Sequence, residues 1–393
     1  MLSRNPLFFQ PATTLQNGNP SSQTVSRDPQ TTTPAGGGGA LTSFVHESRK
    51  CNQLATSVPG NAFGGVVTKT LKPAAGYQRG LWIVLTATGG VNGTNTVAIK
   101  ADAPWVAIQT IQVKDAFGTP VYQCDGFGMF LIHVYSGQVG GAGLQDPTKD
   151  PNYVATSVGT TGTGNFTYCL FVPFELDPDT GYCSLPSMNT AASMTLAITL
   201  GTSAQFYSVA PGTLPLIQVD VYQEFWAVPI SDPALAPPDD GSSHQWTQSQ
   251  GQVGIASGAN NRVQLPDVGS YITSLIILMR DSTNARTDQP FNTDLELWVD
   301  GVPVKIESPN LAFARMYRLF GYTRPTGVLV YSFRHSTGLF VSEDNLEQLL
   351  ATTPGTLVEL FSGAWGTITN SPATAFTYTG KLFPIGAVAE HGF

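Results

Sequence analysis

Two stretches of the chain share one pattern: WVAIQTIQVKDAFGTPVYQCDGFGMFLIHVYSG (residues 105–137) and DLELWVDGVPVKIESPNLAFARMYRLFGY (residues 294–322). In each, an alternating apolar strand leads to an aspartate, a short turn with glycine and a Pro-Val pair that opens the next strand, and an aromatic segment of helical character follows. Pro120 and Pro303 are 183 residues apart, and Asp115 and Asp300 are 185 apart. A self-similarity of this length indicates a tandem duplication of one structural unit.

The composition favours an all-β protein. Glycine (41 residues) and proline (28) are abundant without a collagen-like period, which is typical of many short strands joined by tight turns. Only 12% of the residues are charged, which fits either a surface packed in a tight array or a surface rich in Thr, Ser and Asn. The net charge is −8 and no cluster of Lys and Arg stands out, so we expect no sequence-specific nucleic-acid binding.

The strand pattern predicts two tandem jelly-roll β-sandwiches, with short helices in the connections between strands. We place the first jelly roll at residues 77–228 and the second at 244–380, with the Pro-rich linker PISDPALAPPDDGSS (229–243) between them. Residues 381–393 are predicted to be a C-terminal tail. The sandwich interiors are expected to contain four tryptophans, namely Trp82, Trp105, Trp226 and Trp298.

Residues 1–76 are predicted to form an N-terminal arm that is partly flexible, since TTTPAGGGGA (31–40) is too rich in glycine to pack. After this tract, a helical stripe is predicted from the positions of Leu41, Phe44, Val45, Cys51 and Ala55. An arm that lies against another surface and a disordered tail both remain open. The chain shows neither the pattern of a secretory signal peptide nor an apolar run that approaches a membrane span. The four cysteines are expected to be reduced, and a Cys169–Cys183 bridge stays open.

No constellation of residues points to an enzyme, so we expect no catalytic residues, no cofactor and no metal. The histidines lack metal-ligand spacing and are interpreted as structural. Asp177 and Asp179 suit a calcium loop, but their Asp-Pro-Asp-Thr-Gly context is ordinary turn chemistry. Asp220 and Glu224 share one face of a predicted strand, as the acid and base of a glycoside hydrolase would, but we interpret them as solvated side chains.

The aromatic segments after the two turns are the other candidates for a site. Their side chains suit either a ligand platform or, as we favour, a helix pinned against the end of its sandwich. Arg315 and Arg318 lie on the second of these helices, and we predict that they pair with acidic groups of a neighbouring subunit. The aromatic residues in question are Phe127, Phe130, Tyr135, Phe313, Tyr317 and Phe320.

The order of these elements resembles a known family. YITSLIILMRDSTNARTDQPFNTDLELWVDG, the Arg-bearing LAFARMYRLFGY and PTGVLVYSF in the second half, and GLWIVLTAT, WVAIQTIQVKDAFGTPVYQ and DGFGMFLIHVYSG in the first, are similar to the double jelly-roll major capsid proteins of tail-less, membrane-containing, tectivirus-like DNA bacteriophages. The resemblance covers residues 77–363 approximately, and it is one of element order rather than of a signature motif.

The resemblance implies a structural subunit of an icosahedral virion, made in the host cytoplasm. It implies a homotrimer whose six jelly rolls form a pseudo-hexagonal capsomer, with neighbouring capsomers and minor capsid proteins as partners. Residues 137–164 and the stretch before Asp294 would be tower or trimer-contact loops, and the arm would lie near an internal membrane or neighbouring capsomers. The alternative is a tandem β-sandwich protein that binds or acts on carbohydrates.

Overall fold

The computed structural model describes most of the chain from Phe44 onward. The described residues are 44–136, 154–188, 193–230, 232–238, 242–258, 262–265, 268–291, 293–333, 349–362 and 365–383. All of them belong to one unit, Thr42–Phe393, and the preceding unit, Met1–Leu41, lies outside them. Residues 31–40 of the arm, residues 137–153 of the expected tower or trimer-contact loop and residues 384–393 of the tail also lie outside the described residues.

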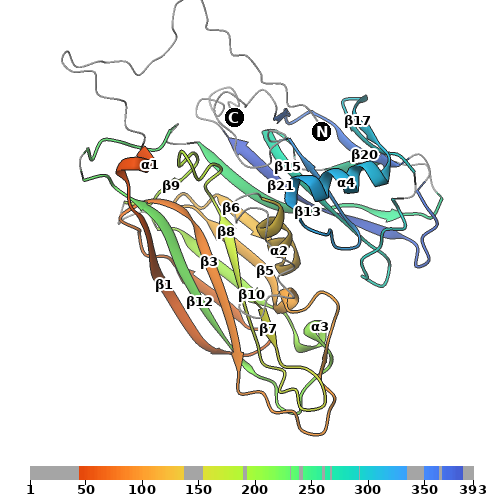
Figure 1. Ribbon diagram of the computed structural model, residues 1–393, viewed down its shortest axis with the longest axis horizontal. Coiled ribbons are helices and arrows are strands. Elements are labelled where there is room, and N and C mark those ends of the chain that lie inside the picture. Colours follow the sequence, from red (N-terminus) through yellow and green to blue (C-terminus); the bar gives the residue numbers. More distant parts are fainter. Residues whose placement is uncertain are drawn as a thin grey trace, which may run out of the picture. The chain divides into compact units, whose positions relative to one another are not determined.

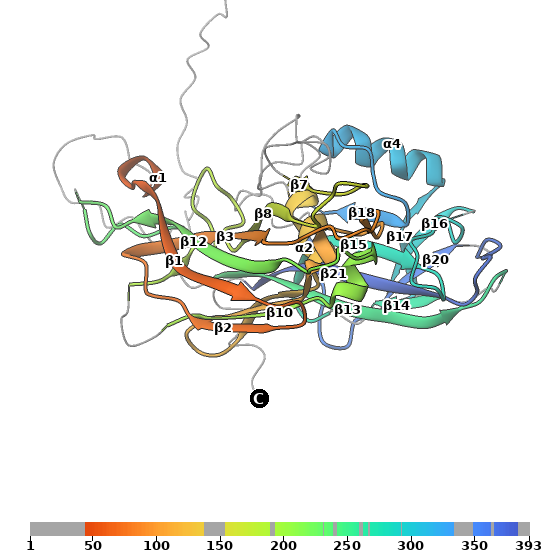
Figure 2. The same cartoon turned by 90° about the horizontal axis from the view of Figure 1, so that it is seen from below.

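The first half forms two β layers with a shared apolar core (Figures 1 and 2). One layer contains, in order, β1 (Lys50–Asn61), β12 (Leu216–Ala227), β3 (Gly76–Thr88), β8 (Phe166–Pro173) and β7 (Val154–Thr156), with β9 (Leu185–Pro186) paired to β3. The other contains β2 (Val66–Thr70), β10 (Thr195–Leu200), β5 (Ile108–Lys114) and β6 (Pro120–Cys124). A small sheet joins β4 (Ala98–Ile99) to β11 (Tyr207–Val209).

The second half repeats this strand order. One layer contains β13 (Ser243–Ile255), β21 (Ala373–Phe383), β15 (Tyr271–Arg280) and β18 (Val328–Ser332), with β19 (Leu350–Ala351) paired to β15. The other contains β14 (Val263–Leu265), β20 (Val358–Ser362), β16 (Leu295–Val299) and β17 (Val302–Glu307). The predicted class, two tandem jelly rolls with helices in the connections, is confirmed.

Four helices occur in the described part of the chain, and two of them follow the duplicated turns as predicted. α2 (Gly126–Tyr135) follows β6, and α4 (Pro309–Phe320) follows β17. The others are single turns, α1 (Phe44–Glu47) and α3 (Ser203–Phe206), and a 3-10 turn at Trp105–Ala107 precedes β5.

Side chains of the long strands alternate between the core and the outer face. In β3, Leu81, Ile83 and Leu85 are fully buried, while the residues between them are half-buried. This period of two is the pattern of a sheet with one face on an apolar core. Burial of aliphatic side chains of this size stabilises the fold by about 1.5–3 kcal/mol each.

The two halves share one sheet. β13, the first strand of the second half, pairs in parallel with β6 of the first half, with Trp246 opposite Tyr122 and Thr247 opposite Gln123. β13 also pairs with β21 of its own half, so hydrogen-bonded strands run from β2 to β18 without a break. The connection between the halves is therefore a strand pairing as well as a covalent link.

Part of the predicted arm differs from the prediction. The predicted helical stripe is wrong from Lys50 onward, because Lys50–Asn61 is the strand β1 and pairs along its length with β12, whereas the short α1 (Phe44–Glu47) is helical. Leu41 lies outside the described residues. Hydrophobicity misleads here, since Leu54 faces outward with 53% of its surface exposed while Gln53 is half-buried. β2 also lies within the predicted arm, and both strands are integral to the first jelly roll. At the other end, β21 continues to Phe383, three residues into the predicted tail.

The tryptophan prediction is correct only for Trp105, which lies in the main apolar core. Trp226 is buried in a separate cluster with Phe44 and Tyr77, and Trp82 and Trp298 lie half-buried on outer faces. Trp82 follows the buried Leu81 in β3 and therefore points away from the core. The guanidinium of Arg262 lies 4.3 Å from the ring centroid of Trp298, which covers the ring from outside.

Candidate functional site

The junction between the two jelly rolls contains the buried helix α2 (Figure 1). Every residue of α2 is buried, and Phe130 stacks on Trp105 with the ring centroids 4.6 Å apart. At the helix end, Tyr135 meets Phe320 edge-on at 5.0 Å and Tyr322 at 6.1 Å, both from the second half. The predicted role of the first aromatic segment, pinning a helix, is confirmed, and the helix packs against both jelly rolls.

Asp125 fastens α2 to the second half. As the N-cap, its Oδ1 accepts from the Gly128 N–H at 2.6 Å, while its Oδ2 accepts from the Gln248 side-chain amide at 2.9 Å. The Asp125 N–H donates in return to the side-chain carbonyl oxygen (Oε1) of Gln248 at 2.5 Å, and the Tyr378 hydroxyl donates to the carboxylate at 3.2 Å. Burial raises the pKa of Asp125, although these donors and the charge of Arg280 oppose that rise. One carboxylate therefore joins three elements of two jelly rolls.

A second polar contact crosses the junction beside α2. Asp102, in the loop before the 3-10 turn, accepts a hydrogen bond from Arg280 at 2.6 Å and forms an ion pair with Arg286 at 2.7 Å. Both guanidinium groups also lie over the ring of Phe127, at 5.5 and 5.0 Å from its centroid. The side chain of Asp102 is only 14% exposed, so these ion pairs are weakly screened.

The second aromatic helix, α4, lies in a more open environment than α2. Ser308 caps it, Gly321 ends it in the left-handed conformation, and only Ala312 and Met316 are buried. Arg324 makes a bidentate ion pair with Asp288, at 2.7 and 2.8 Å, and covers the ring of Phe313 at 3.4 Å. The pinning interpretation therefore fails for Tyr317, which is 61% exposed.

The two arginines predicted to contact a neighbouring subunit differ in their surroundings. Arg315 pairs with Glu307 of β17 in the same chain. Arg318 is exposed on the outer side of α4, and no ion pair joins it to another described residue. Both arginines lie on α4, but only Arg318 is exposed and without an ion pair to another residue in the described part of the chain.

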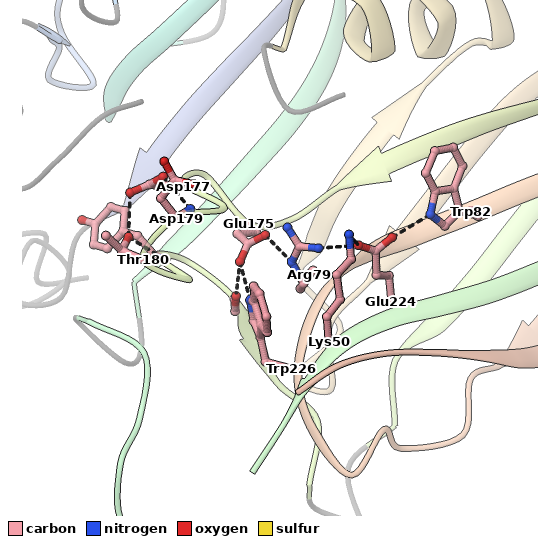
Figure 3. A network of polar contacts seen from close by, with 11 residues as sticks. Lys50, Arg79, Trp82, Glu175, Asp177, Asp179, Thr180, Glu224 and Trp226 are labelled. Carbon is pink, nitrogen blue, oxygen red and sulfur yellow. Dashed lines mark hydrogen bonds and ion pairs between the residues drawn. The ribbon is translucent and has the colours of Figure 1, made fainter. Parts of the chain in front are cut away.

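A buried charge network closes one end of the first sandwich, and no sequence pattern indicated it (Figure 3). Arg79 donates to Glu175 at 2.6 Å and to Glu224, and its guanidinium lies 4.6 Å from the ring centroid of Trp226. Arg79 occupies the bulge where β3 skips a residue against β12. Because a bulge changes which face a side chain enters, alternation alone does not place this arginine.

The two glutamates of this network have further donors. Glu175 accepts from the Trp226 indole at 2.6 Å and from Ser184 at 3.2 Å, and burial raises its pKa to about 7 against the opposing effect of Arg79. Glu224 accepts from the Trp82 indole at 2.7 Å and pairs with Lys50 at 2.6 Å. Lys50 extends the network to β1, so the cluster joins three neighbouring strands and the segment after β8.

The acidic pair considered for glycoside hydrolysis is divided between two roles. Asp220 accepts from Ser57 at 2.5 Å and from Gln218 at 2.8 Å on the outer face. The interpretation of Glu224 as a solvated side chain is wrong, because the network buries it. The two carboxylates therefore lie in different surroundings, Asp220 on the outer face and Glu224 in the buried network.

The remaining candidates have structural surroundings. The Asp177 carboxylate accepts from the Asp179 N–H at 3.0 Å and the Thr180 hydroxyl at 2.7 Å, as turn chemistry predicts. His133 accepts from the Phe171 N–H at 2.9 Å, and burial lowers its pKa to about 3. His335 and His391 lie outside the described residues.

The part of the chain that the structure describes contains no cluster of metal ligands, no disulfide and no membrane-spanning helix. No group of three or more His, Cys, Asp or Glu side chains there is placed to hold a metal ion. All four cysteines are among the described residues and are free thiols, so the bridge left open between Cys169 and Cys183 does not form in this structure. No described helix is long and apolar enough to cross a membrane.

Known structures of the same architecture identify the fold. The chain is similar to the major capsid protein of Sulfolobus turreted icosahedral virus, at 14% identity and a TM-score of 0.59 over 88% of this chain and 99% of that one. The chain has the double jelly-roll fold. The VP54 protein of the virus PBCV-1 is similar at 13% identity and a TM-score of 0.58, over 85% and 93% of the two chains.

A third double jelly-roll protein extends the comparison. The Faustovirus major capsid protein matches at 9% identity and a TM-score of 0.58, over 86% of this chain and 90% of that one. No protein-family model and no curated protein sequence matches the chain. The predicted resemblance is thus confirmed at the level of fold, and identities this low show the fold alone.

Proposed function

We propose that the chain is a major capsid protein, the structural subunit of an icosahedral viral shell. The observation that carries the proposal is the pair of jelly rolls, joined in one chain through α2 and the β6–β13 pairing, in the architecture of viral major capsid proteins. No two carboxylates among the described residues are placed as the acid and base of an enzyme. This agrees with a structural role, but the proposal does not depend on it.

The assembly unit in this proposal is a homotrimer. Each chain contributes two similar units, which we assign to residues 77–228 and 244–380 together with β1 and β2, so three chains present six similar faces to a lattice of neighbours. Closed symmetry within such a capsomer and weaker contacts between capsomers give a finite shell. The chain would be made in the host cytoplasm and reside in the virion, as it would in a tectivirus-like bacteriophage.

Further partners belong to the same proposal. Neighbouring capsomers and minor capsid proteins would contact the outer edges, and the N-terminal arm would lie toward an internal membrane or adjacent capsomers. Arg318, exposed on α4, is the better placed of the two arginines to meet an acidic group of a neighbour, since Arg315 already has Glu307. Charge reversal at Arg318 is expected to weaken assembly more than Arg318→Gln does.

The mass of the purified protein in solution tests the proposal. Light scattering is expected to give about 125 kDa, three times the 41.7 kDa chain, and negative-stain images of that species are expected to show hexagonal outlines. A protein that stays at 42 kDa at high concentration would overturn the capsomer assignment. Binding in a glycan screen by such a monomer would favour a tandem carbohydrate-binding module instead.

A further inference from the structure

The junction between the two jelly rolls has two sides, and each side has a counterpart elsewhere in the chain. It consists of the outer edge of β6, covered by β13 in parallel, and of α2, covered by β13 and β21. If the two jelly rolls arose from one unit, the second jelly roll contains a strand edge equivalent to that of β6. The first jelly roll contains a strand edge equivalent to that of β13.

Bulges in the strands show which residues of β1 and β12 correspond to residues of β13 and β21, the strands that cover β6 and α2. β3 has a bulge at Arg79 where it pairs with β12, and β15 has one at Thr273 where it pairs with β21. Aligning these bulges places Tyr222 at the position of Tyr378. The pairing of β1 with β12 and of β13 with β21 then places Asn52 at Trp246, Gln53 at Thr247 and Leu54 at Gln248.

The covered side aligns in the same way. β6 has a bulge at Val121 and β17 has one at Val304, 183 residues later. This alignment places Lys305 at the position of Tyr122 and Ile306 at the position of Gln123. It also brings the two helix caps, Asp125 and Ser308, into register, which independently supports it.

Equivalent positions differ in burial in the direction that a missing neighbour predicts. Val121 is 1% exposed, whereas Val304 is 46% exposed. Gly128 lies under the ring of Tyr378, so close that an added Cβ would fall 2.0 Å from it, whereas its counterpart Leu311 is 57% exposed. The surface that would cover them shows the converse, because Trp246 is fully buried and its counterpart Asn52 is exposed.

Both strands involved are also edges. β1 ends its layer, and β17 ends the sheet β14–β20–β16–β17, within the described residues. β17 presents Val302, Val304 and Ile306 as exposed apolar side chains, and an edge of this kind is a template for pairing with another chain. β1 and β17 are therefore the two edges that would pair if the β6–β13 junction were repeated between two chains.

We propose that β17 of one copy lies parallel beside β1 of a second copy, with Lys305 opposite Asn52 and Ile306 opposite Gln53. Leu311 of α4 then faces Tyr222 and Leu54 of the second copy, as Gly128 faces Tyr378 inside the chain. The inference rests on the proposed capsomer and specifies its contact. The contact is heterologous, because it joins β17 of one chain to β1 of another, so chains join head to tail. A ring of three chains then contains three junctions within chains and three contacts between chains. If all six have the same geometry, the ring closes.

Disulfide cross-linking tests the register. Neighbouring strands lie about 4.8 Å apart, within the Cα separation of about 4.4–6.8 Å that a disulfide spans. All variants carry Cys51→Ser, because Cys51 lies two residues from Gln53 on the same strand. Oxidation of the double variant Gln53→Cys/Ile306→Cys is expected to give covalent dimers and trimers on a non-reducing gel.

Single variants make the test specific for a head-to-tail contact. Gln53→Cys alone and Ile306→Cys alone are expected to stay monomeric on the gel, while an equimolar mixture of the two, assembled together, gives dimers only. The matched control is Val209→Cys/Ile306→Cys, since Val209 is another exposed strand residue, 43% exposed, outside both edges. This control is expected to give no ladder.

The outcomes separate this inference from the function on which it rests. A trimeric mass of the oxidised double variant, without cross-links above the Val209 control, would overturn the β17–β1 contact and leave the capsomer proposal standing. Dimers formed by either single variant would overturn the head-to-tail arrangement. A monomeric mass of the unmodified protein would overturn both proposals.

A second measurement does not depend on thiol chemistry. Leu54→Asp and Leu311→Asp each place a charge in the proposed contact, on side chains that are 53% and 57% exposed in the single chain. Each is expected to raise the protein concentration at which half of the chains are trimeric by at least tenfold. Val209→Asp is expected to leave this concentration unchanged, and an equal effect of all three variants would refute the contact.

Discussion

Replacement of Arg79 by leucine tests whether the charge network of Figure 3 stabilises the first jelly roll. Arg79 is 9% exposed and contacts Glu175, Glu224 and the ring of Trp226. Leucine removes the Arg79 guanidinium from its ion pair with Glu175, which is 1% exposed. Removal of one partner from a buried ion pair costs about 3–5 kcal/mol, because the remaining charge is left uncompensated.

The structure places the expected cost near the lower end of that range. Glu224 keeps Lys50 and the Trp82 indole, and Glu175 keeps the Trp226 indole and Ser184. Globular proteins gain about 2.1 cal/mol/K of unfolding entropy per residue, so for about 350 residues a loss of about 3 kcal/mol lowers the Tm by about 4 °C. This value applies at pH 8, where Glu175, with a pKa of about 7, is ionised in the parent protein.

Differential scanning calorimetry of three variants separates this effect from a general loss of charge. Arg79→Leu/Glu175→Gln is expected to recover part of the lost Tm, because the uncompensated charge is gone. Arg262→Leu breaks an exposed pair with Glu359 and is expected to lower the Tm by only about 1 °C, since such pairs contribute about 0–1 kcal/mol. A change of less than 1 °C for Arg79→Leu, or one equal to that of Arg262→Leu, would refute the reasoning.

Three further predictions concern buried groups. The pKa of Glu175 is raised in the folded protein from 4.5 to about 7. Protonated Glu175 therefore contributes about 3 kcal/mol to the free energy of unfolding below pH 4.5, and this contribution is lost as the pH rises through 7. Glu175→Gln is expected to flatten this pH dependence in urea titrations at several pH values. Asp125→Ala removes the cap of α2 and the acceptor of Gln248 and Tyr378, and is expected to lower the free energy of unfolding by about 2 kcal/mol, whereas Asp125→Asn, which keeps the cap, costs less in the same titrations. Gly128→Ala forces a methyl group against the Tyr378 ring and is expected to cost about 1–3 kcal/mol, and a neutral result in calorimetry would contradict the packing at the junction.

Local patterns predicted the elements that depend on local chemistry. The aromatic segments predicted to be helical after the two turns are α2 and α4, and the structure adds their caps, Asp125 and Ser308. The duplicated turns and strands also lie where the repeat placed them. These features depend on residues within a few positions of one another, which a single sequence contains.

Features that depend on distant pairing could not be predicted in this way. β1 was missed because its inward side chains include Gln53 while Leu54 faces outward, which reverses the usual signal. The Arg79 network was missed because a bulge and a partner at Glu224, far along the chain, determine its burial. The pairing of β6 with β13 joins strands more than a hundred residues apart, and no turn between them indicates it.

The different chemistry of the internal junction and its proposed external counterpart has a consequence for the order of assembly. Because β6 and β13 belong to one chain, each strand meets the other at a high effective concentration, on the order of millimolar for short linkers, so their junction forms at any dilution. Polar contacts such as the one between Asp125 and Gln248 and aromatic contacts such as the one between Tyr135 and Phe320 then hold it together. The edges of β1 and β17 lack this advantage, and they carry exposed apolar side chains, so the proposed contact between them would depend on the concentration of the protein.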